Sequence, residues 1–254
     1  MRDFRLVGLS IAFAAALAAP SPAQQASGPS FDCARAAAPD EKQICADEKL
    51  AELDRVENAA YRQAMNAAPA QGFTKQETQK DRKGFAKDSL ADRRACGAAA
   101  ICILDAQVAA IDYFSKNGST IAVPPWVGDY RQTYARQHPE IVGAALPKAL
   151  GHCVRAKITS LTDRAGDPLK PKPPGLGADN GVVVDYTHGG HGVSYEYDSQ
   201  AAQARVGDEV LLCLSSIPRD CPPGDDRGRF YSATDLRTGG SWMLLDSQHM
   251  CGGA

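Results

Sequence analysis

The sequence predicts an α+β protein in which a disulfide-stapled helical hairpin or small helical bundle precedes a small antiparallel β-sheet or partly open barrel. Three observations predict this class. Residues 31–118 show helical apolar periodicity, the chain beyond residue 129 has short alternating or β-branched runs, and eight cysteines divide four and four between the two parts. These cysteines are Cys33, Cys45, Cys96 and Cys102, then Cys153, Cys213, Cys221 and Cys251. A chain of 254 residues is long enough for two domains of ordinary size.

The first 23 residues have the features of a secretory signal peptide. Two early arginines precede an apolar run, residues 6–19, that is too short to span a bilayer, and Ser21-Pro22-Ala23 is a small-residue cleavage site. The alternative, an uncleaved membrane anchor, is less favoured because the run is short and rich in alanine. We therefore expect a periplasmic or secreted protein that has no membrane association once the signal peptide is cleaved. The mature chain would begin with a flexible lead-in at residues 24–30. Eight cysteines suit disulfides in such an oxidising compartment.

Start and stop signals divide the helical domain, residues 31–118, into helices. Asp47 is a good N-cap for a first long helix, and residues 69–72 (Pro-Ala-Gln-Gly) break that helix. Thr74, with Glu77 three residues later, forms a capping box that starts a second long helix. A further helical run follows an interruption by glycine and alanine and completes the domain.

The four cysteines of this domain leave the disulfide pairing open. If the chain reverses near residues 70–72, a nested pairing joins Cys33 to Cys102 and Cys45 to Cys96. A local pairing, Cys33 with Cys45 and Cys96 with Cys102, closes shorter loops and is equally compatible with the spacing. Either pairing would stabilise the domain by about 2–4 kcal/mol for each bond.

Residues 119–128, which include Val-Pro-Pro-Trp, predict a linker, and residues 129–254 predict a C-terminal disulfide-bonded β domain. This domain would begin with a short helix near residues 130–136 and continue with about five or six strands. The strand-like runs are residues 152–161, 181–188, 192–197, 209–217 and 229–245. Thr238-Gly239-Gly240 marks a hairpin turn in the last run. For its cysteines we consider a bond between Cys213 and Cys221, which would leave Cys153 to join Cys251.

A motif in the helical domain carries a family resemblance. The matching residues are Cys33-Ala34-Arg35, Glu41 to Asp47, Leu50, Leu53-Asp54, Tyr61, Arg93-Arg94-Ala95-Cys96-Gly97 and Cys102. This pattern, over about residues 31–114, resembles the lysozyme inhibitor LprI N-terminal-like family. One departure is Ser89, which stands about where the family usually has an aromatic residue before the arginine-cysteine element. The resemblance implies a secreted or periplasmic helical domain and, in some members, inhibition of lysozyme, although many members have no established activity.

The predicted function is that of a secreted or periplasmic non-catalytic binding protein, similar to a lysozyme inhibitor and acting at the cell envelope. Its partner would be a lysozyme or another envelope protein. An inhibitor of a basic lysozyme needs an acidic face that steers the encounter, and the first helices are rich in acids. Through the resemblance, Asp54 and Tyr61 are candidate binding residues, with capping or packing inside the hairpin as the competing interpretation. The alternative function is an envelope structural or interaction module that binds a protein or glycan through the β domain.

We expect no catalytic residues, no cofactor and no metal, and hence no enzyme. His188 and His191 flank two glycines, which favours a turn between strands over a zinc site. Ser241 lies near an aspartate and a histidine, Asp246 and His249, but no Gly-x-Ser-x-Gly elbow marks a serine nucleophile. The even cysteine count argues against a free catalytic thiol.

The pattern of charges along the sequence argues against nucleic acid and calcium as ligands. The formal net charge is −2 and no basic stripe stands out along the sequence, so we expect no nucleic-acid binding. Asp225 and Asp226 lie in a glycine-rich loop without the alternating ligands of a calcium-binding EF-hand. A surface loop fixed by a local Asp–Arg pair is the favoured interpretation of that segment.

Overall fold

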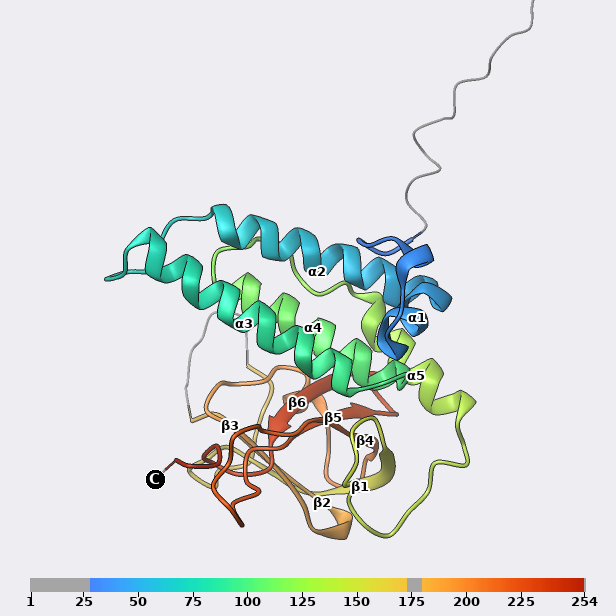
Figure 1. The fold of residues 1–254 in the computed structure, drawn as a ribbon. Helices are drawn as coiled ribbons and strands as arrows, with labels where there is room; N and C mark the ends of the chain where they lie inside the picture. Colours follow the sequence, from blue (N-terminus) through green and yellow to red (C-terminus); the bar gives the residue numbers. More distant parts are fainter. Residues whose placement is uncertain (1–27, 173–179, 254) are drawn as a thin grey trace, which may run out of the picture.

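The computed structural model describes residues 28–172 and 180–253, and these form five α-helices and six strands (Figure 1). The predicted α+β class is confirmed. The strands form a closed antiparallel barrel, so the expectation of an open sheet or partly open barrel is corrected. The predicted signal peptide, residues 1–23, lies outside the described residues, as do residues 24–27 of the lead-in.

Local signals set the helix boundaries much as the sequence predicts. The helices are α1 (Pro39–Ala46), α2 (Glu48–Asn66), α3 (Lys75–Ala95), α4 (Ala100–Lys116) and α5 (Trp126–Gln137), preceded by a 3₁₀ turn, η2 (Cys33–Arg35). Asp47 caps α2, since its carboxylate accepts from the amides of Lys49 at 2.9 Å and Leu50 at 3.2 Å. Thr74 and Glu77 form the predicted capping box at the start of α3.

The helical part is a small bundle with α4 at its centre. One side of α4 packs on α2 and another on α3, and most of its residues are buried, from Ile101 to Phe114. Figure 1 shows α2 and α3 above and in front of α4, with α1 and α5 at one end of the layer. The simple hairpin is therefore completed by a third long helix, which supplies the apolar surface that both others cover.

The barrel follows the order β1-β2-β3-β6-β5-β4. Its strands are β1 (Cys153–Thr162), β2 (Val182–Tyr186), β3 (Gly190–Ser194), β4 (Glu209–Ser216), β5 (Phe230–Asp235) and β6 (Ser241–Leu245). The long strand β1 closes it, because its first half pairs with β4 and its second half with β2. Residues 236–240 connect β5 to β6, which confirms the hairpin turn predicted at Thr238-Gly239-Gly240.

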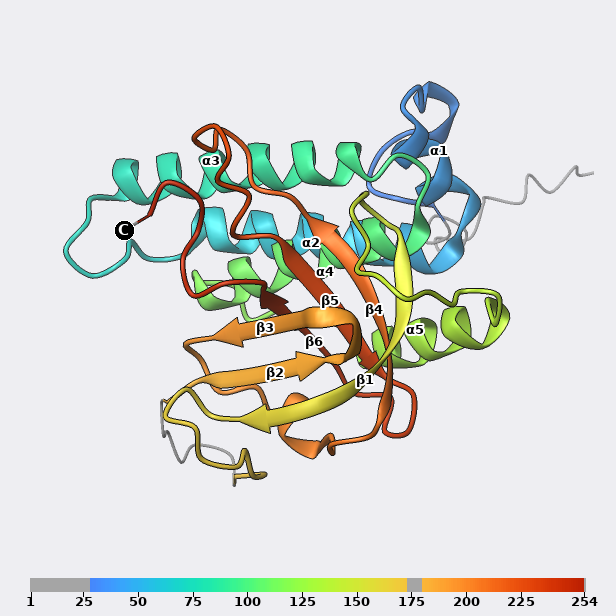
Figure 2. The same cartoon turned by 90° about the horizontal axis from the view of Figure 1, so that it is seen from below.

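The helical layer lies directly on one wall of the barrel (Figures 1 and 2). Leu211 and Cys213, on the outer face of β4, belong to the same buried cluster as Ile103 and Leu104 of α4. Helix α5 begins within the stretch predicted as a linker, at Trp126, and contributes to this cluster. The two parts recognised in the sequence therefore share this interface cluster, while the interior of the barrel forms a separate hydrophobic cluster.

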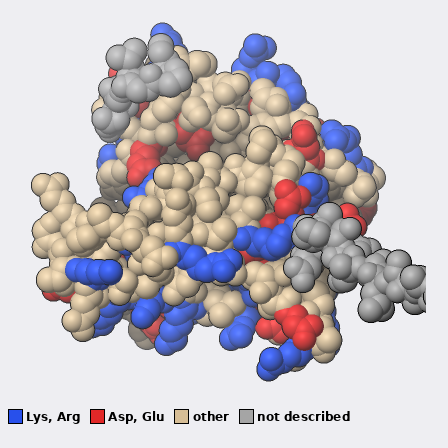
Figure 3. All heavy atoms as spheres, turned by 90° about the horizontal axis from the view of Figure 1, so that it is seen from above, with Lys and Arg blue, Asp and Glu red and all other residues tan. Residues whose placement is uncertain are grey.

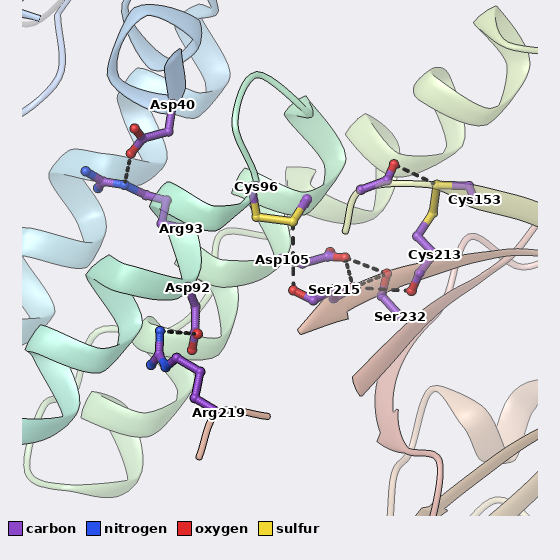
Figure 4. The surroundings of a disulfide bond; sticks show 12 residues. Asp40, Asp92, Arg93, Cys96, Asp105, Cys153, Cys213, Ser215, Arg219 and Ser232 are labelled. Carbon is purple, nitrogen blue, oxygen red and sulfur yellow. Dashed lines mark hydrogen bonds and ion pairs between the residues drawn. A yellow bond between two sulfur atoms is a disulfide. The ribbon is translucent and has the colours of Figure 1, made fainter. Parts of the chain in front are cut away.

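A buried polar cluster fastens α4 to the barrel at this interface (Figure 4). Asp105 of α4 is fully buried, and its Oδ1 lies 2.5 Å from Nη2 of Arg131 on α5. Its Oδ2 accepts hydrogen bonds from Ser232, at 2.5 Å, and from Ser215. One carboxylate thus joins two helices and two strands.

Two disulfides lie in the helical part and two in the β part, and none joins the two parts. This confirms the prediction of disulfide bonds and the division of the cysteines into two groups of four. The pairs are Cys33–Cys45, Cys96–Cys102, Cys153–Cys213 and Cys221–Cys251. The helical domain therefore uses local pairing, because its cysteines lie at helix ends close in sequence. The suggestion of Cys213 with Cys221 is wrong, because the register of β1 and β4 places Cys153 opposite Cys213 with Cα atoms 4.0 Å apart.

Candidate functional site

Asp54, a predicted binding residue, is buried in an ion-pair cluster, and only 4 % of it is exposed. Nη1 of Arg93 lies 3.1 Å from Oδ1 of Asp54, and Nε of Arg93 lies 3.1 Å from Oδ2 of Asp40. The backbone amide of Ser30 donates to the other oxygen of Asp54 at 2.7 Å. The aspartate and the arginine of the family-like motif thus bind each other and tie α1, α2 and α3 together (Figure 4 shows the Asp40–Arg93 contact).

Tyr61, the second predicted binding residue, packs inside the helical bundle. Its ring meets Phe114 edge to face, with centroids 5.5 Å apart, and the phenol is only partly exposed. Ser89 is buried on α3, and the aromatic contacts of that helix come from Phe85, which stacks on Tyr113 at 3.5 Å. Asp54 is therefore buried within the bundle, and Tyr61 is partly exposed and packs on Phe114.

A different surface displays acidic and aromatic groups, at the junction of α2 and α5. The indole Nε1 of Trp126 donates to Glu52 at 2.8 Å, and the hydroxyl of Tyr130 donates to Asp47 at 2.7 Å. Glu48 lies one turn before Glu52 on α2 and is exposed. With exposed Asp129, which follows Trp126 by three residues on α5, these groups define the α2–α5 surface: Asp47, Glu48, Glu52, Trp126, Asp129 and Tyr130.

The charges of the α2–α5 surface are fixed by its hydrogen bonds. The side chain of Lys49 and the indole of Trp126 both lower the pKa of Glu52, so this carboxylate stays ionised. Burial, and then the bond to Asp47, raises the pKa of Tyr130, so its hydroxyl stays a neutral donor. Lys49 belongs to the same surface, because its ammonium pairs with Glu52 at 2.8 Å and lies 4.6 Å from the centroid of the Trp126 ring. The two oriented aromatic rings are 6.4 Å apart between centroids.

Sequence analysis assigned Trp126 to a linker and missed this surface. A signal was present, since Trp126, Tyr130 and Tyr134 recur at intervals of four residues, which is the spacing of one helix face. The two prolines before Trp126 were interpreted as part of a linker, so the start of the helix was placed after Trp126. Proline is also common at the start of a helix, where its missing N–H costs nothing.

Of the histidines considered for zinc, His188 lies in the turn from β2 to β3, and His191 lies in β3 opposite Asp185 of β2. His188 adopts a left-handed backbone with φ of 68°, and Nδ1 of His191 lies 2.7 Å from Oδ1 of Asp185. In residues 28–172 and 180–253, no three His, Cys, Asp or Glu side chains are grouped so as to hold a metal ion.

The other candidate side chains are held in local structure. Arg227 binds Asp225 at 2.8 Å and holds the pKa of that carboxyl below its usual range. Asp226 pairs with Arg229 at 2.7 Å. The loop is thus held by local Asp–Arg pairs, as the sequence predicts. The carboxylate of Asp246 accepts from the amide of Gly228 at 2.8 Å. Within the described chain, no hydrogen bond joins this carboxylate to the nearby serine and histidine considered for catalysis.

Two hollows mark the surface elsewhere. One, of about 320 Å³, lies on the outside of β1 between Arg155, Lys157 and His188. The other, of about 210 Å³, lies beside the ion pair that Arg219 forms with Asp92 at 3.0 Å. Thr187 and Glu209 also line the first hollow, where Glu209 pairs with Arg155 at 2.7 Å and the hydroxyl of Thr187 accepts from the amide of Lys157 at 3.0 Å.

No family model, curated protein or solved structure matches this chain. The described helices include none that is both long and apolar enough to cross a membrane. Four disulfides are typical of proteins from an oxidising, extracellular environment. The class supported by fold and site is thus a disulfide-bonded α+β protein with an acidic, aromatic surface.

Proposed function

We propose that this chain is a secreted or periplasmic, non-catalytic binding protein that acts at the cell envelope, with a basic lysozyme as its partner. The observation that carries the proposal is the α2–α5 surface, where four acids and one lysine, Lys49, surround two hydrogen-bonded aromatic rings. The resemblance to the lysozyme inhibitor LprI N-terminal-like family supports the same partner class. The motif residues Asp54 and Arg93 would then shape the helical domain, and residues outside the motif would make the contact.

The chemistry of the surface suits a basic protein. Negative charge on one face raises the encounter rate with a positive partner, and aromatic side chains supply contact area at low entropic cost. Trp126 and Tyr130 are already oriented by Glu52 and Asp47, so little side-chain freedom is lost on binding.

The test is the rate at which a lysozyme clears bacterial cell walls, with the oxidised chain lacking residues 1–23 titrated in. The helical part is not tested alone, because α4 buries part of its surface on β4 and would expose it in a fragment. Glu48→Lys with Asp129→Lys reverses two exposed charges of the surface and should weaken inhibition by about tenfold or more. Asp167→Lys with Asp226→Lys reverses two exposed acids away from this surface; it is the control matched in charge and should inhibit like the natural protein.

Two outcomes would contradict the proposal. Equal inhibition by the variant with Glu48→Lys and Asp129→Lys and by the natural chain would remove the α2–α5 surface as the contact. No inhibition of any of several lysozyme types at micromolar protein would remove lysozyme as the partner. The alternative, an interaction module acting through the barrel, would then be tested at the hollow beside Arg155 and Lys157.

A further inference from the structure

Helix α3 carries a row of basic side chains along one exposed side. Lys80, Lys83, Lys87 and Arg94 are all exposed and follow one another at helical intervals of three, four and seven residues. We call these four residues the α3 basic ridge. Figure 3 shows basic side chains recurring along the lower half of that view, over α3. The sequence showed no basic stripe because the four cations are spread over 15 positions and only the helix aligns them.

The acids of α3 do not neutralise this ridge, because each has another partner. Glu77 caps Thr74, and Asp81 accepts from the hydroxyl of Tyr113 at 2.6 Å. Asp92 and Asp88 both lie near Arg219 from the barrel side, at 3.0 Å and 4.0 Å. In the described part of the chain, the three ridge lysines form no ion pair or hydrogen bond.

The ridge is unfavourable for the helix itself. Lys80 and Lys83, and then Lys83 and Lys87, are like charges on adjacent turns, which weaken an isolated helix. Gly84 lies among them in the helix interior, although an added side chain there would meet nothing within 4 Å. Packing within the fold therefore does not require a glycine at this position. Because glycine has no side chain, an external surface can approach the helix backbone closely here.

We propose that the α3 basic ridge is a docking surface for an anionic lipid bilayer. The ridge is about 21 Å long at 1.5 Å per residue and lies on a convex helix face, and neither hollow of the surface is lined by its lysines. This shape fits a flat array of phosphate headgroups. Clustered lysines and arginines beside a membrane bind such headgroups, each cation contributing about a fivefold gain in partitioning.

An exposed aromatic side chain at the end of the ridge favours a bilayer over a soluble polyanion. Phe73, at the tip between α2 and α3, is 61 % exposed. Aromatic rings insert into the headgroup region of a membrane. The ridge lies on a different helix from the α2–α5 surface, so membrane docking would leave the proposed partner site free.

The experiment is co-sedimentation of the oxidised chain, without residues 1–23, with lipid vesicles. Vesicles of phosphatidylcholine alone are compared with vesicles that contain about 30 % phosphatidylglycerol. The test variant combines Lys80→Gln, Lys83→Gln and Lys87→Gln, and the control combines Lys148→Gln, Lys157→Gln and Lys170→Gln, which are exposed lysines elsewhere. Thermal unfolding of each variant checks the fold, since glutamine and lysine have similar helix propensity.

The natural chain and the control variant should bind the anionic vesicles and leave neutral vesicles unbound. The ridge variant should bind the anionic vesicles about 100-fold more weakly, and added salt should release the natural chain. Three results would overturn the proposal: no binding to anionic vesicles at low salt, equal binding by the ridge and control variants, or salt-sensitive binding to soluble polyphosphate without binding to vesicles.

Discussion

Asp105→Ala tests whether the buried polar cluster fastens the helices to the barrel. The carboxylate is fully buried, and its partner Arg131 is only 3 % exposed. Removing the acid leaves the guanidinium buried without a counter-charge, which costs about 3–5 kcal/mol. The hydroxyls of Ser215 and Ser232 also lose a charged acceptor, but the 3.0 Å hydrogen bond between them remains. The loss of this acceptor therefore adds only about 1 kcal/mol to the destabilisation. The expected loss of about 4–6 kcal/mol is a large share of a typical total of about 5–15 kcal/mol.

The assay is equilibrium urea unfolding of the oxidised protein, followed by tryptophan fluorescence. The two tryptophans report on both parts, since Trp126 lies on α5 and Trp242 on β6 in the barrel core. The shared interface cluster predicts one transition for both probes in the natural chain. In Asp105→Ala we expect either a single weakened transition or separate transitions for the helical layer and the barrel.

A double-mutant cycle identifies the cause. Arg131→Met removes the charge that Asp105→Ala would strand, so the double variant should lose about 2–3 kcal/mol less than the sum of the single losses. A loss below about 1 kcal/mol in Asp105→Ala, or additive losses in the double variant, would refute the reasoning, because a desolvated ion pair must show coupling.

Three further predictions concern single elements. Burial raises the pKa of Glu57 from 4.5 to about 8, so the native state holds an extra proton between these two pH values. The free energy of unfolding should therefore fall by at most about 1.4 kcal/mol per pH unit as the pH rises from 4.5 to 8. Glu57→Gln should abolish this fall, as measured by urea unfolding at about pH 5 and about pH 8. Gly151→Ala should lower the free energy of unfolding by more than about 2 kcal/mol, because φ is +74° and the new Cβ would lie 2.3 Å from Cβ of Ala99. Replacing Cys153 and Cys213 by serine should lower it by about 4 kcal/mol, since the bond closes a separation of 60 residues in the unfolded chain.

Each of these predictions has a clear contrary result. Parallel pH profiles for Glu57→Gln and the natural chain would show that this carboxyl titrates normally. Gly72→Ala is the control for Gly151→Ala, because Gly72 also has positive φ but open space around it, and equal losses would remove the steric argument. A serine double variant at positions 153 and 213 with unchanged thermal unfolding would show that strand pairing alone holds β1 to β4.

The family-like motif was found from the sequence, but its structural role was not. Asp54 and Arg93 both belong to the motif, yet 39 positions separate them, and only the packing of α2 on α3 brings them within 3.1 Å. Tyr61 was a candidate binding residue with packing inside the hairpin as the alternative, and its contact, Phe114, lies on a helix 53 positions further along the chain. Trp126 was assigned to a linker because of the prolines before it, and its hydrogen-bond partner Glu52 lies 74 positions away in the sequence.

The sequence by itself determined the features that depend on near neighbours along the chain. Asp47 and Thr74 cap their helices, Thr238-Gly239-Gly240 turns a hairpin, and alternating runs form the strands, because hydrogen bonds and side-chain periodicity within a few residues decide each of them. Only the tertiary structure decided that the barrel is closed, that Cys153 pairs with Cys213, and that helices and barrel share an interface around Asp105. These features depend on strand register and on helix packing between residues 60 to 127 positions apart, and no local preference of the chain encodes them.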